Sequence, residues 1–204
     1  HDVARRPGGL EERHAEALEV MQALRVRVEQ QLAVNAGAAA QVELRALLGQ
    51  LGIDAAVYQT SLDQPAEAVA TLRTAIELLT QADARYDRGR AHTNLGHLYT
   101  RTGRVAEALR EFNAAAIDIL GTSEVDAVPE RWKAADMLFL EQAIAHLSLN
   151  LLPEAAADLD RALALFEQSN QRYEWGQTIY FRALVALREN AVESARGQLE
   201  IAAN

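Results

Sequence analysis

Cysteine is absent from this chain of 204 residues, so it can form neither disulfide bonds nor metal sites built on thiolates. Only four prolines interrupt the sequence, which leaves long stretches free to form helices. Aromatic residues make up 5% of the chain although 50% of it is hydrophobic, and the apolar residues are mainly Ala and Leu, which favour helix. The composition therefore predicts an all-α protein.

Basic residues are also scarce. The chain has 20 Lys and Arg against 29 Asp and Glu, a net charge of −9, and no run of basic residues. Nucleic acid binding requires a clustered basic face, so we expect no nucleic-acid partner. No apolar stretch approaches the roughly 20 residues of a membrane-spanning helix, and we expect no membrane association. A cysteine-free chain fits a cytoplasmic protein.

A repeat is the strongest pattern in the sequence. Asp63, Gly103, Asn150 and Asn190 recur at spacings of 40, 47 and 40 residues, and each can end a helix or accept a left-handed backbone. Small residues precede and follow these turns in register, which lets paired helices approach closely, and a large apolar residue fills the space between hairpins. The columns are Ala56, Gly96, Ala143 and Ala183; Ala68, Ala108, Ala155 and Ala195; Leu72, Phe112, Leu159 and Leu199; and Ala75, Ala115, Ala162 and Ala202.

One copy of the repeat resembles a known family. Leu95-Gly96-His97-Leu98-Tyr99, followed by Ala108-Leu109-Arg110-Glu111-Phe112, is similar to the signature of the tetratricopeptide repeat family. The chain departs from it at His92, where the family has Trp, and its repeats exceed the usual length of about 34 residues. The resemblance covers about residues 50–204. It implies a right-handed superhelical stack of about nine helices in antiparallel hairpins, of the long-repeat type common in bacterial signalling proteins.

We expect residues 1–9 to be a tag remnant or a disordered lead, since the chain begins at His1, and residues 10–204 to form a single solenoid. A loop is expected at 121–128. Pro65, Pro129 and Pro153 suit the first turns of helices. The predicted helices are 10–34, 38–61, 65–84, 88–101, 105–120, 129–149, 153–169, 172–189 and 191–203.

The resemblance implies a protein- or peptide-binding concave face, lined by the first helix of each hairpin. The candidate residues on it are Arg90, Asn94, His97, Arg101, Met137, Leu140, Glu141, Ile144, Tyr180 and Leu184, flanked by Ile53, Val57, Thr93, Gln177, Phe181 and Arg188. One hypothesis is that Arg90, Asn94 and Arg101 anchor an acidic or backbone-rich segment. The alternative is that the arginines pair with neighbouring carboxylates. The apolar members could form a groove for a partner helix or belong to the core.

Catalysis and metal binding are not expected. His92 and His97 are not spaced to share a helical face as metal ligands, no serine lies in a nucleophile motif, and no glycine-rich phosphate loop is present. His146 replaces the repeat tyrosine and is predicted to pack. Asp158 and Asp160 are predicted to lie on a solvated helix face. We therefore predict no cofactor, no metal and no enzymatic activity.

Two functional classes remain open. The first is a binding scaffold within a larger signalling protein, where similar repeats accompany a CHAT protease or a DNA-binding domain. The second is a domain of a bacterial regulator that encloses a small molecule or signal peptide. Trp132 and Trp175 seal hairpins or act as binding hot spots. Val192, Leu199 and Ile201 have no following hairpin, so we expect one of two arrangements: the parent protein continues with another module, or the C-terminal helix mediates self-association.

Overall fold

The computed structural model describes residues 9–34, 37–121 and 129–202, excluding the side chains of 129–134 and of 202. Within these ranges the regular structure is entirely helical, which confirms the predicted all-α class. The expected lead at 1–9 and loop at 121–128 lie outside them, apart from Gly9 and Gly121. The helices are α1 (Leu10–Ala33), α2 (Ala38–Ser61), α3 (Pro65–Gln81), α4 (Arg85–Arg101), α5 (Val105–Leu120), α6 (Pro129–Ser148), α7 (Leu152–Ser169), α8 (Arg172–Arg188) and α9 (Val192–Ala202).

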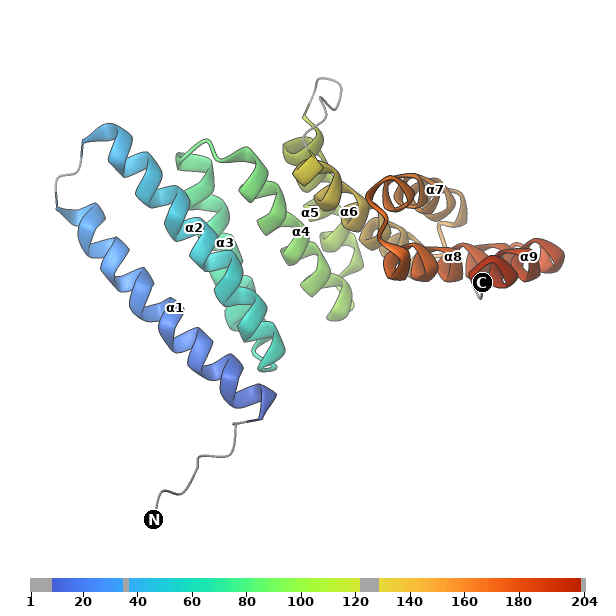
Figure 1. Cartoon of the computed structure of the whole chain (residues 1–204), viewed down its shortest axis with the longest axis horizontal. Helices are drawn as coiled ribbons and strands as arrows, with labels where there is room; N and C mark the ends of the chain where they lie inside the picture. The colour runs from blue at the N-terminus through green and yellow to red at the C-terminus, as the bar shows by residue number, and fades with distance from the viewer. Residues whose placement is uncertain (1–8, 35–36, 122–128, 203–204) are drawn as a thin grey trace, which may run out of the picture. The chain divides into compact units, whose positions relative to one another are not determined.

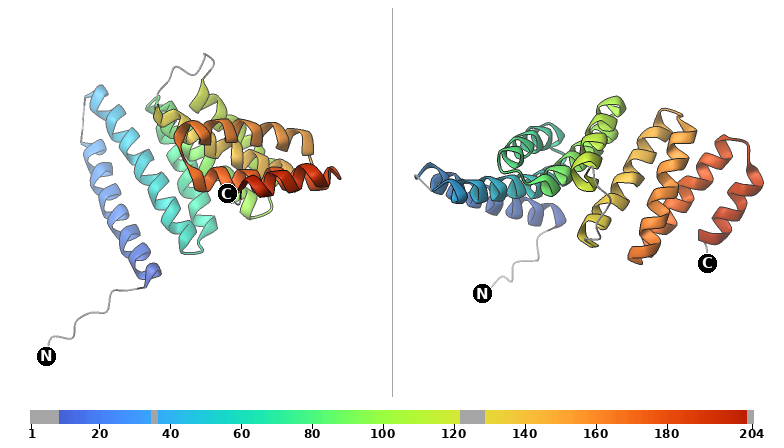
Figure 2. Two further views of the ribbon diagram at one scale, coloured as in Figure 1. Left: turned by 45° about the vertical axis from the view of Figure 1, so that its right-hand side comes forward. Right: turned by 90° about the horizontal axis from the view of Figure 1, so that it is seen from above.

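The helices form two compact units, His1–Leu98 and Tyr99–Asn204, and the boundary between them falls within α4. In the first unit α2 packs against both α1 and α3, as Figure 1 shows. In the second unit α5 to α9 pack in chain order, and α6 also touches α8 (Figure 2). The single solenoid expected over 10–204 stays a prediction.

Left-handed residues connect the helices of each hairpin, at the positions the repeat predicted. The φ angles are 56° at Asp63, 75° at Gly103, 58° at Asn150 and 60° at Asn190. Two further turns, at Asp83 and Asn170, have φ angles of 51° and 54° and connect successive hairpins. These two were not predicted, although each lies midway between two predicted turns.

A shared hydrogen bond closes these turns. The residue after the left-handed one donates its N–H to a carbonyl five residues back, the pattern that satisfies the last carbonyls of a helix. The Arg104 N–H reaches the Tyr99 oxygen at 2.7 Å, and the Leu151 N–H reaches the His146 oxygen at 2.9 Å. The left-handed turn at Asp83 also explains why α3 ends at Gln81 rather than at the predicted 84.

The repeat columns form the core. Ala68, Ala108 and Ala155 are each 0% exposed, and Leu72, Phe112 and Leu159 are at most 1% exposed. In the last hairpin, by contrast, Leu199 is 42% exposed. The small residues therefore act as predicted, by allowing helices to approach.

Two glycines bring α2 especially close to α3. A Cβ atom on Gly49 would lie 2.4 Å from Cγ of Leu79, and one on Gly52 would lie 3.0 Å from Cβ of Ala75. Leu79 and Ala75 are fully buried, so neither has free space to move into. This contact fixes the hairpin on which the first candidate surface is built.

Candidate functional site

The polar face of α4 begins with a local ion pair. Arg90 Nη1 lies 3.1 Å from Oδ1 of Asp87, one turn earlier, and the second carboxylate oxygen accepts a 2.7 Å bond from Gln50 of α2. Arg90 therefore pairs with a neighbouring carboxylate, which is the alternative to its role as an anchor for a partner. The Arg90 side chain is still 41% exposed, and an exposed pair of this kind contributes only about 0–1 kcal/mol.

Asn94 and His97 line a pocket of about 230 Å³ within the first unit. The pocket lies between α2 and α4, the first helices of successive hairpins, and Leu72 and Leu98 contribute buried apolar atoms. Val57 also lines it and is 49% exposed. The remaining lining residues are Ala56, Thr60 and Ser61.

Among the polar side chains of this pocket, the amide of Asn94 is available to bond a ligand. Thr60 and Ser61 donate their hydroxyls to carbonyls of their own helix, those of Ala56 and Val57, at 2.7 and 3.0 Å. The Asn94 side chain makes no hydrogen bond to any residue that the structure describes. The pocket therefore combines an apolar surface with a donor and an acceptor on Asn94.

Arg101, the last residue of α4, belongs to the second unit. It is exposed and has no ion pair within the described residues. The structure therefore places Arg90 and Asn94 in one unit and Arg101 in the other.

The predicted apolar stripe of α6 and α8 is only partly accessible. Met137 and Tyr180 are 37% and 56% exposed, and the Tyr180 ring lies edge-on to Phe181 at 5.7 Å. Ile144 and Leu184 are half-buried.

Three members of the predicted face are buried in the structure. Leu140 and Ile53 are each 1% exposed and Glu141 is 9% exposed, because α6 and α2 are each covered by helices on more than one side. Leu140 belongs to the core cluster with Ala143, Leu147 and Phe166.

Two polar side chains of the second unit have structural contacts. His146 Nδ1 lies 2.8 Å from Oδ2 of Asp158, so it packs between α6 and α7. Asp158 is 6% exposed, which corrects the prediction of a solvated face, and burial raises its pKa. Arg188 donates a 2.6 Å bond to the Leu147 carbonyl, which links the end of α8 to the end of α6.

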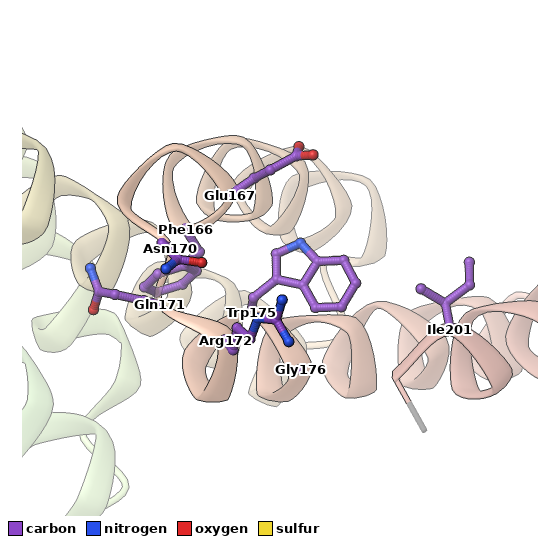
Figure 3. A pocket seen from close by; sticks show the side chains of 8 residues that line it. All are labelled: Phe166, Glu167, Asn170, Gln171, Arg172, Trp175, Gly176 and Ile201. Carbon is purple, nitrogen blue, oxygen red and sulfur yellow. The ribbon is translucent and has the colours of Figure 1, made fainter. Parts of the chain in front are cut away.

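A larger pocket, of about 430 Å³, lies within the second unit between α7, α8 and α9 (Figure 3). The half-buried ring of Trp175 stands between α7 and α8, beside the fully buried Phe166, and Ile201 contributes from α9. The polar lining residues are Glu167, Asn170, Gln171 and Arg172, with Gly176 beside them. Among these residues, the sequence analysis singled out Trp175 and Ile201, the latter as an apolar residue of the last helix.

Behind this pocket, a buried carboxylate connects α6 to the turn before α8. Asp136 is 0% exposed and accepts a 2.8 Å hydrogen bond from Nε2 of Gln171 and a 2.6 Å bond from the Met137 N–H. Burial raises the pKa of Asp136 to about 6, against the lowering effect of these bonds. The side chain of Gln171 therefore borders the pocket and is fixed in place by its hydrogen bond to buried Asp136.

The described residues provide neither a metal-binding cluster nor a membrane-spanning helix. No cluster of three or more His, Cys, Asp or Glu side chains suited to a metal ion occurs among the described residues. Across the same part of the chain, every helix is too short or too polar to cross a membrane.

Comparison with known proteins supports the fold. No protein-family model matches the sequence. No curated protein matches it either. BtubC from P. vanneervenii superposes with a TM-score of 0.68 at 14% identity, covering 96% of this chain and 90% of that one. A putative kinesin light chain from Podosopora anserina, with nearly identical TPR-like repeats, gives 0.57 at 15% identity, covering 96% and 95%. The fold is a TPR-like helical repeat.

The tetratricopeptide resemblance of the sequence is thereby confirmed at the level of fold. In TPR-like terms, α2, α4, α6 and α8 are the first helices of their hairpins, and α3, α5, α7 and α9 are the second helices. The smaller pocket lies between first helices, whereas the Trp175 pocket is walled on two sides by second helices.

Proposed function

We propose that the chain is a protein-interaction scaffold that binds an extended peptide segment along the first helices of its TPR-like hairpins. The observation that carries this proposal is the α2–α4 pocket, which places an amide without a hydrogen-bond partner among the described residues, that of Asn94, beside an apolar surface. Peptide recognition commonly combines such a pocket for a side chain with hydrogen bonds to the main chain.

The pocket size suits one apolar side chain. A volume of about 230 Å³ is below the range of roughly 300–1,000 Å³ for small-molecule sites. A Leu or Met side chain of the peptide would contact Val57 and Leu98, while the Asn94 amide would bond the peptide backbone. This favours the scaffold over a regulator that encloses its ligand in this unit.

In the second unit, the exposed apolar members of the predicted face are Met137 and Tyr180. Exposed aromatic and Met side chains are enriched at binding sites. Arg101, exposed and without an ion pair among the described residues, supplies a cation for an acidic residue of the partner. We propose that a bound segment with mixed acidic and apolar residues uses these contacts.

The wider setting is also a proposal. Absence of cysteine suits a cytoplasmic scaffold, and long helical repeats suit the recruitment arm of a bacterial signalling protein. In that setting the scaffold has no catalytic step of its own.

Peptides selected from a random display library against the intact chain test the proposal. Asn94→Ala should weaken their binding about three- to tenfold, since it removes one or two hydrogen bonds. Val57→Asp should weaken it more than tenfold, because it places a charge in the apolar wall. Affinities are measured by fluorescence anisotropy of labelled peptides.

Thr74→Ala is the matched control, because Thr74 is exposed on α3 and its hydroxyl bonds only to Ala70 of its own helix. It should leave binding unchanged. The proposal fails if the library gives no binders, or if the selected peptides bind the Asn94 and Val57 variants as tightly as the original chain.

A further inference from the structure

The Trp175 pocket is a second cavity with a different character from the peptide surface. All eight residues that line it belong to the second unit, and its volume of about 430 Å³ lies within the range of small-molecule sites. Its apolar part is formed by the faces of Phe166, Trp175 and Ile201, from three different helices.

The repeat does not require these large residues where they stand. At the position of Trp175, the other hairpins have Leu48, Arg88 and Ala135. At the position of Ile201 they have Thr74, Ala114 and Arg161. Trp175 packs against the core cluster of the second unit, but the repeat itself does not demand an indole or an isoleucine in these two columns.

Polar groups at the rim have unused bonding capacity. The Trp175 indole N–H makes no hydrogen bond to any described residue, and within the same part of the chain Arg172 forms no ion pair. Figure 3 shows Trp175 with Arg172 on its α8 side and Glu167 on its α7 side. Both Arg172 and Glu167 are exposed.

Gln171 and the α7 wall fix the shape of the cavity. Gln171 donates to buried Asp136 at 2.8 Å and to the Ser169 hydroxyl at 2.9 Å, so its amide nitrogen is already used. Phe166 is 0% exposed and belongs to the core cluster. The cavity therefore has a rigid apolar base, and its available donors are at the rim.

From this arrangement we propose that the pocket binds an aromatic carboxylate. The ring of the ligand lies against Trp175 and Ile201, and its carboxylate accepts hydrogen bonds from the guanidinium of Arg172. Arg presents a fork of donors that matches a carboxylate. Glu167 opposes the ligand charge from the α7 side and keeps the affinity moderate.

The same chemistry has two sources. One is a free small molecule, and the other is a peptide that ends in an aromatic residue with a free carboxylate. Both place a ring and a carboxylate a few bonds apart, so the experiment uses a probe for each source.

The test is NMR of the ¹⁵N-labelled intact chain, observing the indole N–H of Trp175. The chain has two tryptophans, so Trp132→Phe assigns the signal and leaves Trp175 as the only indole. Phenylacetate should shift this signal saturably, whereas phenethylamine, a cation of similar size, should not. A short peptide ending in Phe, compared with its C-terminal amide, tests the second source.

Matched rim variants separate charge from packing. Arg172→Gln removes the cation that binds the carboxylate and should weaken phenylacetate binding about fivefold. Glu167→Gln removes the opposing anion and should strengthen binding. Both residues are exposed, so neither change alters the core. The proposal is overturned if phenylacetate gives no saturable shift, if phenethylamine shifts the signal equally, or if Arg172→Gln binds as well as the original chain. None of these outcomes bears on the α2–α4 pocket.

Discussion

At the scale of single residues, the buried carboxylate of Asp136 should make the stability of the second unit depend on pH. It has two hydrogen bonds, from Gln171 and from the Met137 N–H, yet its pKa is raised to about 6 because burial outweighs them. Nearby Glu174 raises the pKa further. Asp136 therefore carries a cost at neutral pH and connects α6 to the turn before α8.

The sign of its pH dependence follows from linkage. The folded-state pKa of about 6 is above the unfolded-state value of about 3.9, so the cost of ionised Asp136 is full above pH 6 and falls as the pH drops through 6 towards 4. Asp136→Asn, which cannot ionise, should gain stability relative to the original chain at pH 7.5. That gain should shrink by about 1 kcal/mol at pH 5.

Urea denaturation of both chains at the two pH values measures this difference, and contributions of the other carboxylates cancel between them. Asp160→Asn is the control, because Asp160 is 60% exposed in its pair with Arg182. A gain for Asp136→Asn that is equal at both pH values would contradict the role of burial.

At this scale the sequence had little predictive power. Asp136 and Asp158 are buried, but neither differs in sequence pattern from an exposed acid such as Asp160. Their burial depends on which helices cover α6 and α7, and a single sequence does not contain that information. Asn94 and His97, which line one pocket in the structure, were both predicted to face the partner because the repeat register assigns α4 as a first helix.

At the scale of helices, the approach of α2 to α3 depends on glycine. Gly49→Ala places a Cβ against Leu79, and it should lower the free energy of unfolding by about 1–3 kcal/mol despite the higher helix propensity of Ala. Gly197→Ala is the same change in α9 with no atom within 4 Å, and it should raise stability by up to about 1 kcal/mol.

Urea denaturation measures the free energy of unfolding of the two variants. Because the gain in helix propensity from Gly to Ala is the same in both, the difference between them reports the α2–α3 contact. Equal effects of the two substitutions would show that propensity alone acts and that the α2–α3 contact is not tight.

Helix pairing was the most predictable level of this structure. Small residues recur at fixed distances from each turn, and those distances reflect the geometry of two packed helices, so the columns identified the core. The turns at Asp83 and Asn170 were missed because the repeat was aligned by hairpin, whereas a residue with positive φ follows each helix from α2 to α8. Leu140 of the predicted face is buried because α6 contacts α5, α7 and α8 and has little free surface.

At the scale of the whole molecule, the chain consists of two units, each with its own candidate surface. Similarity to BtubC and to the kinesin light chain repeats, at 14% and 15% identity, establishes the fold. The partner depends instead on a few exposed side chains such as Val57 and Tyr180, which the fold does not constrain. That is why the sequence predicted the architecture better than the site.

The most direct test of the scaffold uses the absence of cysteine, which allows a single thiol to be introduced and labelled anywhere. An environment-sensitive fluorophore is attached to Val57→Cys or to Tyr180→Cys, both on first helices. The control carries it at Arg110→Cys, because Arg110 is an exposed residue of α5, a second helix. On addition of display-selected peptides, our account predicts a saturable emission change at Val57 or Tyr180 and none at Arg110. A change at Arg110 alone, or binding that alters none of the three labels, would contradict it.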